Sequence, residues 1–199
     1  MNQKKQLQEI RKFIYNKFYR DETGHDFYHM ARVAEMARSI SISENADSFI
    51  CEVAGWVHDI GDHKLFNHPN KEIEKMKGFL KSIHMNNKQI AQINAAIKDI
   101  SFSKGNLTPK TLEGKIVQDA DRLDAIGAIG IARTFAYGGA NGQLIYHPVN
   151  KEGTSIQHFY DKLLKLKDSI NTSTGKKIAE KRHIILKNFL EQFFDEWIN

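Results

Sequence analysis

The chain has 199 residues, of which 41% are hydrophobic and 27% are charged, a composition that predicts one globular domain spanning residues 1–199. No apolar run approaches the roughly 20 residues of a membrane span, and the segment 1–6 lacks the apolar core of a signal peptide. The single cysteine, Cys51, excludes an internal disulfide. We therefore expect a cytoplasmic protein with no membrane partner.

The formal net charge of +5 is modest for this length, and much of it lies on lysine-rich helical faces at the two ends of the chain. Such charge favours solubility, and it also attracts small polyanionic substrates. The sequence has no dense run of lysine and arginine with interleaved aromatic residues, so no nucleic-acid partner is expected.

In the first half of the chain, apolar residues recur at helical spacing. The pattern predicts a first helix carrying Leu7, Ile10, Ile14 and Phe18, a second from about Asp26 to Ile42, a third from about Ala46 to His58-Asp59, a fourth marked by Ile73 to Ile83, and a fifth by Ile90 to Ile97.

The second half continues in the same way after a polar loop at 101–110. A sixth helix is predicted from near Leu112, a long glycine-containing loop at 138–153, and two last helices near 155–170 and 176–198. The apolar stripe of the last helix needs a partner: packing in the core is the favoured use, and a homodimer contact is the alternative. Since no segment alternates with a period of two, the predicted fold is all-α.

One dipeptide stands out, because the apolar run 53–57 ends in His58-Asp59, followed by Gly61 and Asp62. A core helix has no packing use for such an ending. Adjacent side chains in a helix point about 100° apart, but at a helix end both can converge on a metal ion.

Two further segments carry matching chemistry, Gly24–His29 and Gln118–Asp124. An early histidine, a His-Asp pair and a distant aspartate, in this order, resemble the HD-domain superfamily of metal-dependent phosphohydrolases. The similarity covers residues 20–140, and the motif contexts resemble small, single-domain bacterial members that act on nucleotides. The resemblance implies an HD-type helical bundle, with the motifs in a core at about 20–140 and the C-terminal helices 155–198 packing on it.

Matched residue by residue, the resemblance implies four metal ligands: His29, His58, Asp59 and Asp121. Two imidazoles and two carboxylates without a thiolate suit one divalent ion, with manganese favoured and magnesium, iron, cobalt or nickel as alternatives.

Asp119 competes with Asp121 as the fourth ligand, and residues two apart on a helix face nearly opposite ways, so only one can point at the ion. The context Ala120–Leu123 matches the family and favours Asp121. Asp124 shares the helix face of Asp121 and is expected to line the pocket with the substrate-binding residues.

Asp62 and His25 are the candidate acid–base residues. Asp62 follows Asp59 at the spacing where HD enzymes often carry an acidic residue, so it is expected either to move a proton or to serve as a solvated turn residue. His25 precedes His29 by four residues, and it either contacts the substrate phosphates or leaving group, or forms local hydrogen bonds in a turn.

Four basic residues are candidates for binding a substrate phosphate: Arg32, Lys64, Lys104 and Arg122. For each of them alone, a surface charge or a structural ion pair is an equal alternative. The segment Tyr137–Gly142 is rich in glycine but is not a P-loop, because no Gly-Lys-Ser/Thr follows, so it is read as a plain loop or a mobile flap.

The expected function is metal-dependent hydrolysis of a phosphoester or phosphoanhydride in a small phosphorylated substrate, with cleavage of nucleoside triphosphates to monophosphate and pyrophosphate favoured. The alternatives are a nucleoside monophosphatase, a cyclic-nucleotide phosphodiesterase and an alarmone hydrolase. From a different class, a non-catalytic ligand-binding HD module is the competing interpretation, although the intact ligand set argues against it.

Overall fold

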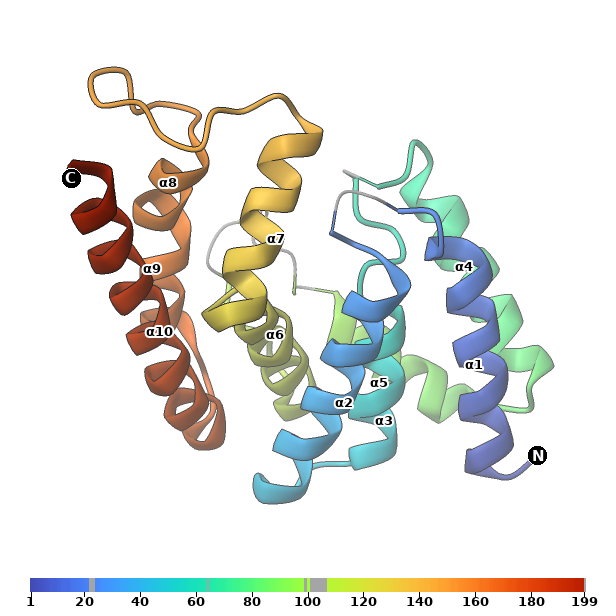
Figure 1. Ribbon diagram of the computed structural model, residues 1–199. Helices are drawn as coiled ribbons and strands as arrows, with labels where there is room; N and C mark the ends of the chain where they lie inside the picture. The colour runs from blue at the N-terminus through green and yellow to red at the C-terminus, as the bar shows by residue number, and fades with distance from the viewer. Residues whose placement is uncertain (22–23, 64, 99, 101–106, 199) are drawn as a thin grey trace.

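The computed structural model describes residues 1–21, 24–63, 65–98, 100 and 107–198 (Figure 1). These residues contain helices and loops but no β-strand, which confirms the predicted all-α fold. Within the same residues, no helix combines the length and the apolar character that crossing a bilayer requires.

The helices of the first half lie close to their predicted positions, because polar side chains mark their starts. Asn2, Asp26 and Asp47 each accept hydrogen bonds from backbone N–H groups in the first turn of the helix that follows. The helices are α1 (Gln3–Phe18), α2 (Phe27–Ser43), α3 (Ser48–Val57), α4 (Pro69–Ser82) and α5 (Asn87–Ile97).

The second half differs from the prediction in two places. A break at residues 125–127 separates α6 (Leu112–Asp124) from α7 (Gly127–Ala140), so the loop expected at 138–153 begins after residue 140. Gly127 has φ +76°, a conformation that favours glycine, and the helical pattern of the sequence runs across it.

The helix expected at 155–170 is a composite of short pieces. These are α8 (Ser155–His158), the π-helix η2 (Phe159–Leu163), α9 (Leu164–Leu166) and the 3-10 turn η3 (Lys167–Ser169), before α10 (Ser173–Ile198).

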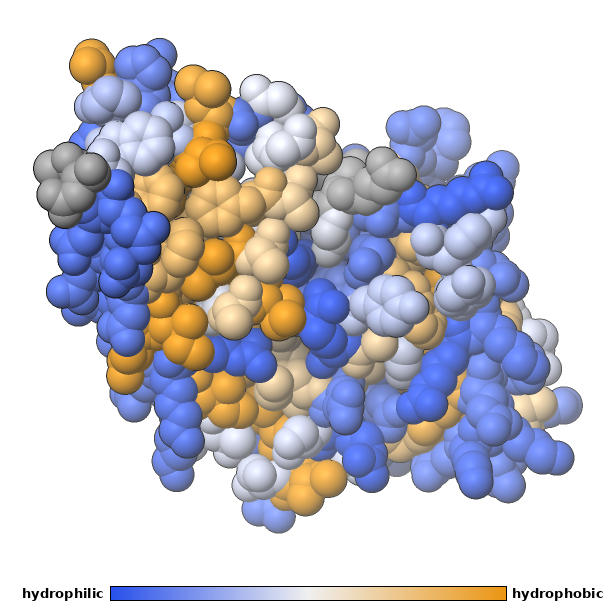
Figure 2. Space-filling view, viewed as in Figure 1, coloured by the Kyte–Doolittle hydropathy of each residue, from blue (hydrophilic) through white to orange (hydrophobic). Residues whose placement is uncertain are grey.

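Helices α2, α3 and α6 pack on one another in the middle of the molecule. Figure 1 shows α1 and α4 on one side of them and α7 to α10 on the other. Figure 2 shows hydrophobic side chains gathered over the α7–α10 side of this face, whereas the side over α1 is mostly hydrophilic. Buried residues such as Ile10, Met30, Ile50 and Leu123 form the core.

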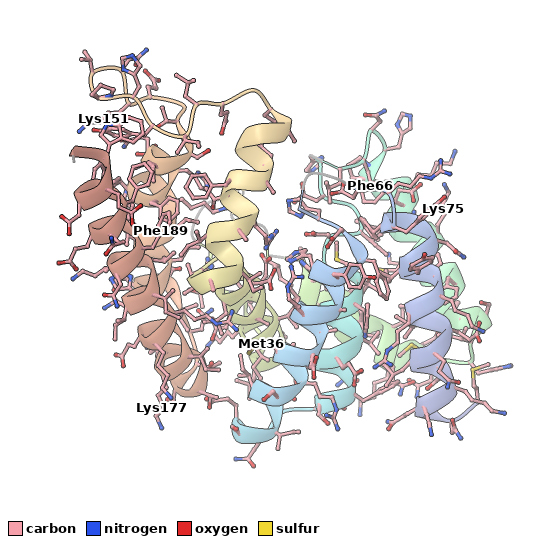
Figure 3. The ribbon with its side chains drawn as sticks, in the orientation of Figure 1. Met36, Phe66, Lys75, Lys151, Lys177 and Phe189 are labelled. Carbon is pink, nitrogen blue, oxygen red and sulfur yellow. The ribbon has the colours of Figure 1, made fainter. Side chains whose placement is uncertain are left out.

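Helix α10 packs against α7 and α6. Phe189, labelled in Figure 3, stacks on Phe159 of the π-helix with ring centroids 5.5 Å apart, and it meets Phe135 of α7 edge to face at 5.7 Å. Phe189 and the buried Leu190 therefore use part of the stripe for packing inside the chain, whereas Ile184, Ile185 and Trp197 are exposed.

A close approach between α2 and α3 places the later site. A Cβ atom on Gly55 would lie 2.6 Å from the Cα atom of Ala34, so glycine lets the two helix backbones touch. This contact brings the C-terminal end of α3, with His58 and Asp59, beside the first turn of α2, with His29.

Candidate functional site

Three helices bring the four expected ligands together. His29 comes from the first turn of α2, His58 and Asp59 follow the end of α3, and Asp121 comes from α6. The Nε2 atom of His29 lies 3.6 Å from a carboxylate oxygen of Asp59 and 3.6 Å from one of Asp121. The Nε2 atom of His58 lies 3.3 Å and 3.7 Å from the same two carboxylates. All four side chains thus surround one small space.

Hydrogen bonds fix which nitrogen of each imidazole faces this space. The Nδ1 atom of His29 donates to Asp124 at 2.8 Å, and the Nδ1 atom of His58 donates to the carbonyl of Gly55 at 2.8 Å. Because Nδ1 is used in these bonds, Nε2 is the nitrogen of each ring that faces the space between the carboxylates and could bind an ion. Both Nε2 atoms are buried without a hydrogen-bond partner, which fits histidines that bind a metal.

The electrostatics of the cluster also favour a cation. Burial alone would lower the pKa of His58, but the negative charges of Asp59 and Asp121 outweigh burial and raise this pKa to about 9. Burial would raise the pKa of Asp59, but His58, His25 and His29 hold it well below its ordinary value. The buried carboxylate of Asp59 and the partly exposed carboxylate of Asp121, beside two imidazoles, therefore form a site with the donor atoms and the negative charge that a divalent ion requires.

Asp119 and Asp121 lie on opposite sides of α6. The Asp119 carboxylate is fully buried and accepts hydrogen bonds of 2.7–2.8 Å from the backbone and side chains of Asn171 and Thr172. It therefore ties α6 to the start of α10, whereas Asp121 faces the two histidines.

His25 lies at the edge of the cluster. Its Nδ1 atom donates to the Asp59 carboxylate at 2.8 Å, and its backbone N–H donates to Asp21 at 3.0 Å. The imidazole is about a third exposed and lines a cavity next to the ligands. His25 is thus placed within reach of a molecule bound at Asp59.

Asp62 follows a turn that ends α3. The helix stops at Val57, and Gly61 has φ +92°, so Asp62 is not one helical turn beyond Asp59. A Cβ atom on Gly61 would collide with Ile73 at 2.6 Å. The backbone N–H of Asp62 donates to the carbonyl of Asp59 at 3.1 Å, and Asp62 lines the same cavity as the ligands.

This first cavity encloses about 390 Å³. Its wall includes six of the expected site residues: His25, His58, Asp59, Asp62, Asp121 and Arg122. Arg122 is 5% exposed, donates through Nη1 to the carbonyl of Ser169, and keeps Nε and Nη2 without a hydrogen bond. Burial lowers the pKa of its guanidinium, which the nearby charges of Asp119 and Asp121 oppose. A buried guanidinium with two unused donors suits an anionic ligand.

Arg32 and Asp124 are placed differently from the expectation that they contact substrate. Arg32 binds both carboxylate oxygens of Asp124, at 2.7 and 3.0 Å, and neither residue lines the cavities found beside the ligands in the described part of the chain. Asp124 also accepts from His29, and its pKa is held far below the ordinary value: burial would raise it, but His29, Arg32 and Arg133 prevail. The pair thus orients the imidazole of His29, one of the expected ligands.

Several cavity residues carry no signal in the sequence. Arg133 of α7 donates to Asp124 at 2.8 Å and to the carbonyl of Gly24 at 2.7 Å, and it lines the cavity together with Lys162 of the π-helix. Lys77 and Lys98 line its other side. No motif marks these positions. Two expected phosphate contacts, Lys64 and Lys104, lie outside the described residues.

Comparisons with known proteins place this geometry in a family. A family model described as HD domain matches residues 26–126, which contain all four expected ligands. The chain is 39% identical over 195 residues to the uncharacterized protein YpgQ of Bacillus subtilis, with 96% of this chain and 94% of that protein covered.

Two solved structures resemble the whole chain. The structure of Bacillus subtilis YpgQ in complex with ADP has a TM-score of 0.86 at 36% identity and covers 98% of this chain and 97% of that chain. A HD-superfamily hydrolase from Bacillus thuringiensis has a TM-score of 0.82 at 41% identity, with 98% of both chains covered. The chain therefore belongs to the HD-domain family of metal-dependent phosphohydrolases.

Proposed function

We propose that this phosphohydrolase acts on nucleotides and cleaves nucleoside triphosphates to the monophosphate and pyrophosphate. The observation that carries the proposal is the His29, His58, Asp59 and Asp121 cluster, which adjoins a cavity lined by several cationic side chains. Such a combination suits a substrate with more than one phosphate. The similarity to a protein crystallised with ADP supports a nucleotide as the substrate.

The four ligands would hold one divalent ion, with manganese favoured for a mixed nitrogen and oxygen site. Such an ion, when bound, polarises a phosphoryl oxygen and lowers the pKa of water. The protein's own part is positioning: Arg122, Arg133 and Lys162 line the cavity and would neutralise phosphate charge. Asp124 and Arg32 would hold the imidazole of His29 in one tautomer and one orientation.

Two residues at the cavity wall are proposed to move protons. Asp62 would take a proton from the attacking water, because the residue lines the cavity but is not one of the four proposed ligands. His25, hydrogen-bonded to Asp59 and partly exposed, would give a proton to the leaving group.

A metal-supplemented screen tests the proposed reaction. Purified protein with manganese should convert at least one nucleoside triphosphate to the monophosphate and pyrophosphate, separated by ion-exchange chromatography. Excess chelator should abolish turnover, and added manganese should restore it. Orthophosphate as the sole product from monophosphates, or opening of a cyclic nucleotide instead, would contradict the proposed bond, and full turnover in chelator would contradict the metal.

The substitution Asp62→Asn tests the proton role. The variant should keep its metal and roughly its KM, because Asp62 is not a ligand, while kcat should fall about 100-fold or more. Steady-state kinetics and elemental analysis measure both quantities. Asp168→Asn, at a side chain that is 79% exposed and does not line either cavity, is the matched control and should behave as wild type. Turnover of Asp62→Asn within a few-fold of wild type would make Asp62 a turn residue.

The substitution Asp124→Asn tests whether this buried carboxylate positions His29. The variant should bind manganese about 10- to 100-fold more weakly, because the hydrogen bond that fixes the imidazole loses its charge. Competition with a metal-binding dye measures this affinity. If Asp124 contacts substrate instead, KM will rise at saturating manganese while the affinity for the metal stays unchanged.

A further inference from the structure

A second cavity adjoins the one beside the ligands. It encloses about 410 Å³ between α7 and the helical run that begins with α8, within the roughly 300–1,000 Å³ of small-molecule sites. Four residues line both cavities, so the two meet there: His25, Ala125, Arg133 and Lys162. A ligand whose reacting group lies at the metal-binding cluster can therefore extend into either cavity.

The two cavities differ in the charge of the residues that line only one of them. The first cavity alone is lined by three cations, Lys77, Lys98 and Arg122, and by three carboxylates, Asp59, Asp62 and Asp121. Among the described residues, the second cavity has no lysine or arginine beyond the two that it shares, and Asp161 adds a carboxylate. A divalent ion held by Asp59 and Asp121 would offset the charge of those two carboxylates, so the three cations of the first cavity would be available to terminal phosphates. The first cavity is therefore the better place for them.

The wall of the second cavity suits a nucleoside. The Tyr137 side chain is 46% exposed and offers an aromatic face, and the Gln143 amide supplies both a donor and an acceptor. Asp161 and Thr134 add oxygen acceptors that can meet the amino groups of a base or the hydroxyls of a sugar. Ring stacking with neutral hydrogen bonds is how proteins recognise bases and sugars.

Local structure explains how these side chains reach the cavity. Gly138 packs directly against the Ser155 side chain, where a larger residue would collide, so the end of α7 lies on α8. The chain then turns back, with the backbone N–H of Gln143 donating to the carbonyl of Gly138 at 2.8 Å. This turn is the glycine-rich segment that follows Tyr137 in the sequence.

The opposite wall is a π-helix, Phe159–Leu163, which carries Asp161 and Lys162. The extra residue per turn of such a segment changes which side chains face a neighbouring surface, and π-helical turns occur frequently at functional sites. Here both residues line the second cavity, and Gln157 donates to Asp161 at 2.9 Å.

We propose that the second cavity is the nucleoside subsite, with Tyr137 against the base and Gln143 and Asp161 as its hydrogen-bonding partners. The phosphates then pass His25, Arg133 and Lys162 and end beside the cations of the first cavity. This assignment rests on the proposed nucleotide hydrolysis and specifies which side of the cluster each half of the substrate occupies.

Binding measurements distinguish the contacts of the nucleoside from the contacts of the phosphates. The ligands are the α,β-methylene analogues of dATP, dCTP, dGTP and dTTP, and inorganic tripolyphosphate, which has no nucleoside; titration calorimetry gives the affinities. Tyr137→Ala and Gln143→Ala should each lower the affinity for the analogue that wild type binds most tightly. The expected loss is about tenfold, within the roughly 5- to 150-fold range of a lost base stack. The affinity of both variants for tripolyphosphate should stay within about twofold of wild type, whereas Lys77→Met should weaken both ligands.

Tyr160→Ala is the matched control, because Tyr160 is 42% exposed on the same π-helix and lines neither cavity. It should bind both ligands as wild type does. If Tyr137→Ala and Gln143→Ala, folded by circular dichroism, bind the analogue as wild type, the nucleoside lies elsewhere. If the two substitutions lower the affinity for tripolyphosphate as much as the affinity for the analogue, the second cavity holds phosphates. A wild-type protein that hydrolyses no nucleotide would instead overturn the proposed function.

Discussion

The buried carboxylate of Asp124 connects the parts of the site. It accepts hydrogen bonds from His29 of α2, Arg32 of α2 and Arg133 of α7, while its own backbone ends α6. Three positive or polarised groups stabilise its negative charge, which explains why this carboxyl has a pKa far below the ordinary value although it is buried. Removing the carboxylate would leave two guanidinium groups and an imidazole without their common acceptor.

This network also connects the proposed metal site to the proposed substrate site. Arg133 bonds to Asp124 on one side and lines both cavities on the other. The side chain that helps to orient the His29 imidazole is therefore proposed to be one that meets a phosphate. A shift of α7 would move Arg133, and through Asp124 it would disturb the His29 imidazole together with the proposed phosphate contact.

Much of the fold could be predicted from the sequence, because its signals are local. Ile10 and Ile14 mark the buried face of α1, and Asp26 and Thr111 cap helices near their expected starts. The break at Gly127 could not be predicted, because apolar residues continue at helical spacing on both sides of it. The irregular helical run from Ser155 likewise depends on packing against α7 and α10 rather than on local propensity.

Part of the candidate site could likewise be predicted from the sequence, and part of it could not. Motif order predicts the convergence of the four ligands, since each lies in a recognisable context. Arg133, Lys162 and Tyr137 lie in no such context, because they reach the cavities only through the packing of α7 and the π-helix. The contact between Arg32 and Asp124 is likewise a tertiary pairing between residues 92 apart in the chain.

We propose that one divalent ion binds between His29, His58, Asp59 and Asp121. Elemental analysis of manganese-loaded wild type, Asp121→Asn and Asp119→Asn after gel filtration tests it most directly, since the two aspartates are neighbours on α6 with opposite surroundings. We predict about one manganese per chain in the wild type and in folded Asp119→Asn, and a much lower content in Asp121→Asn. Full manganese content in Asp121→Asn, together with its loss in Asp119→Asn, would contradict the account.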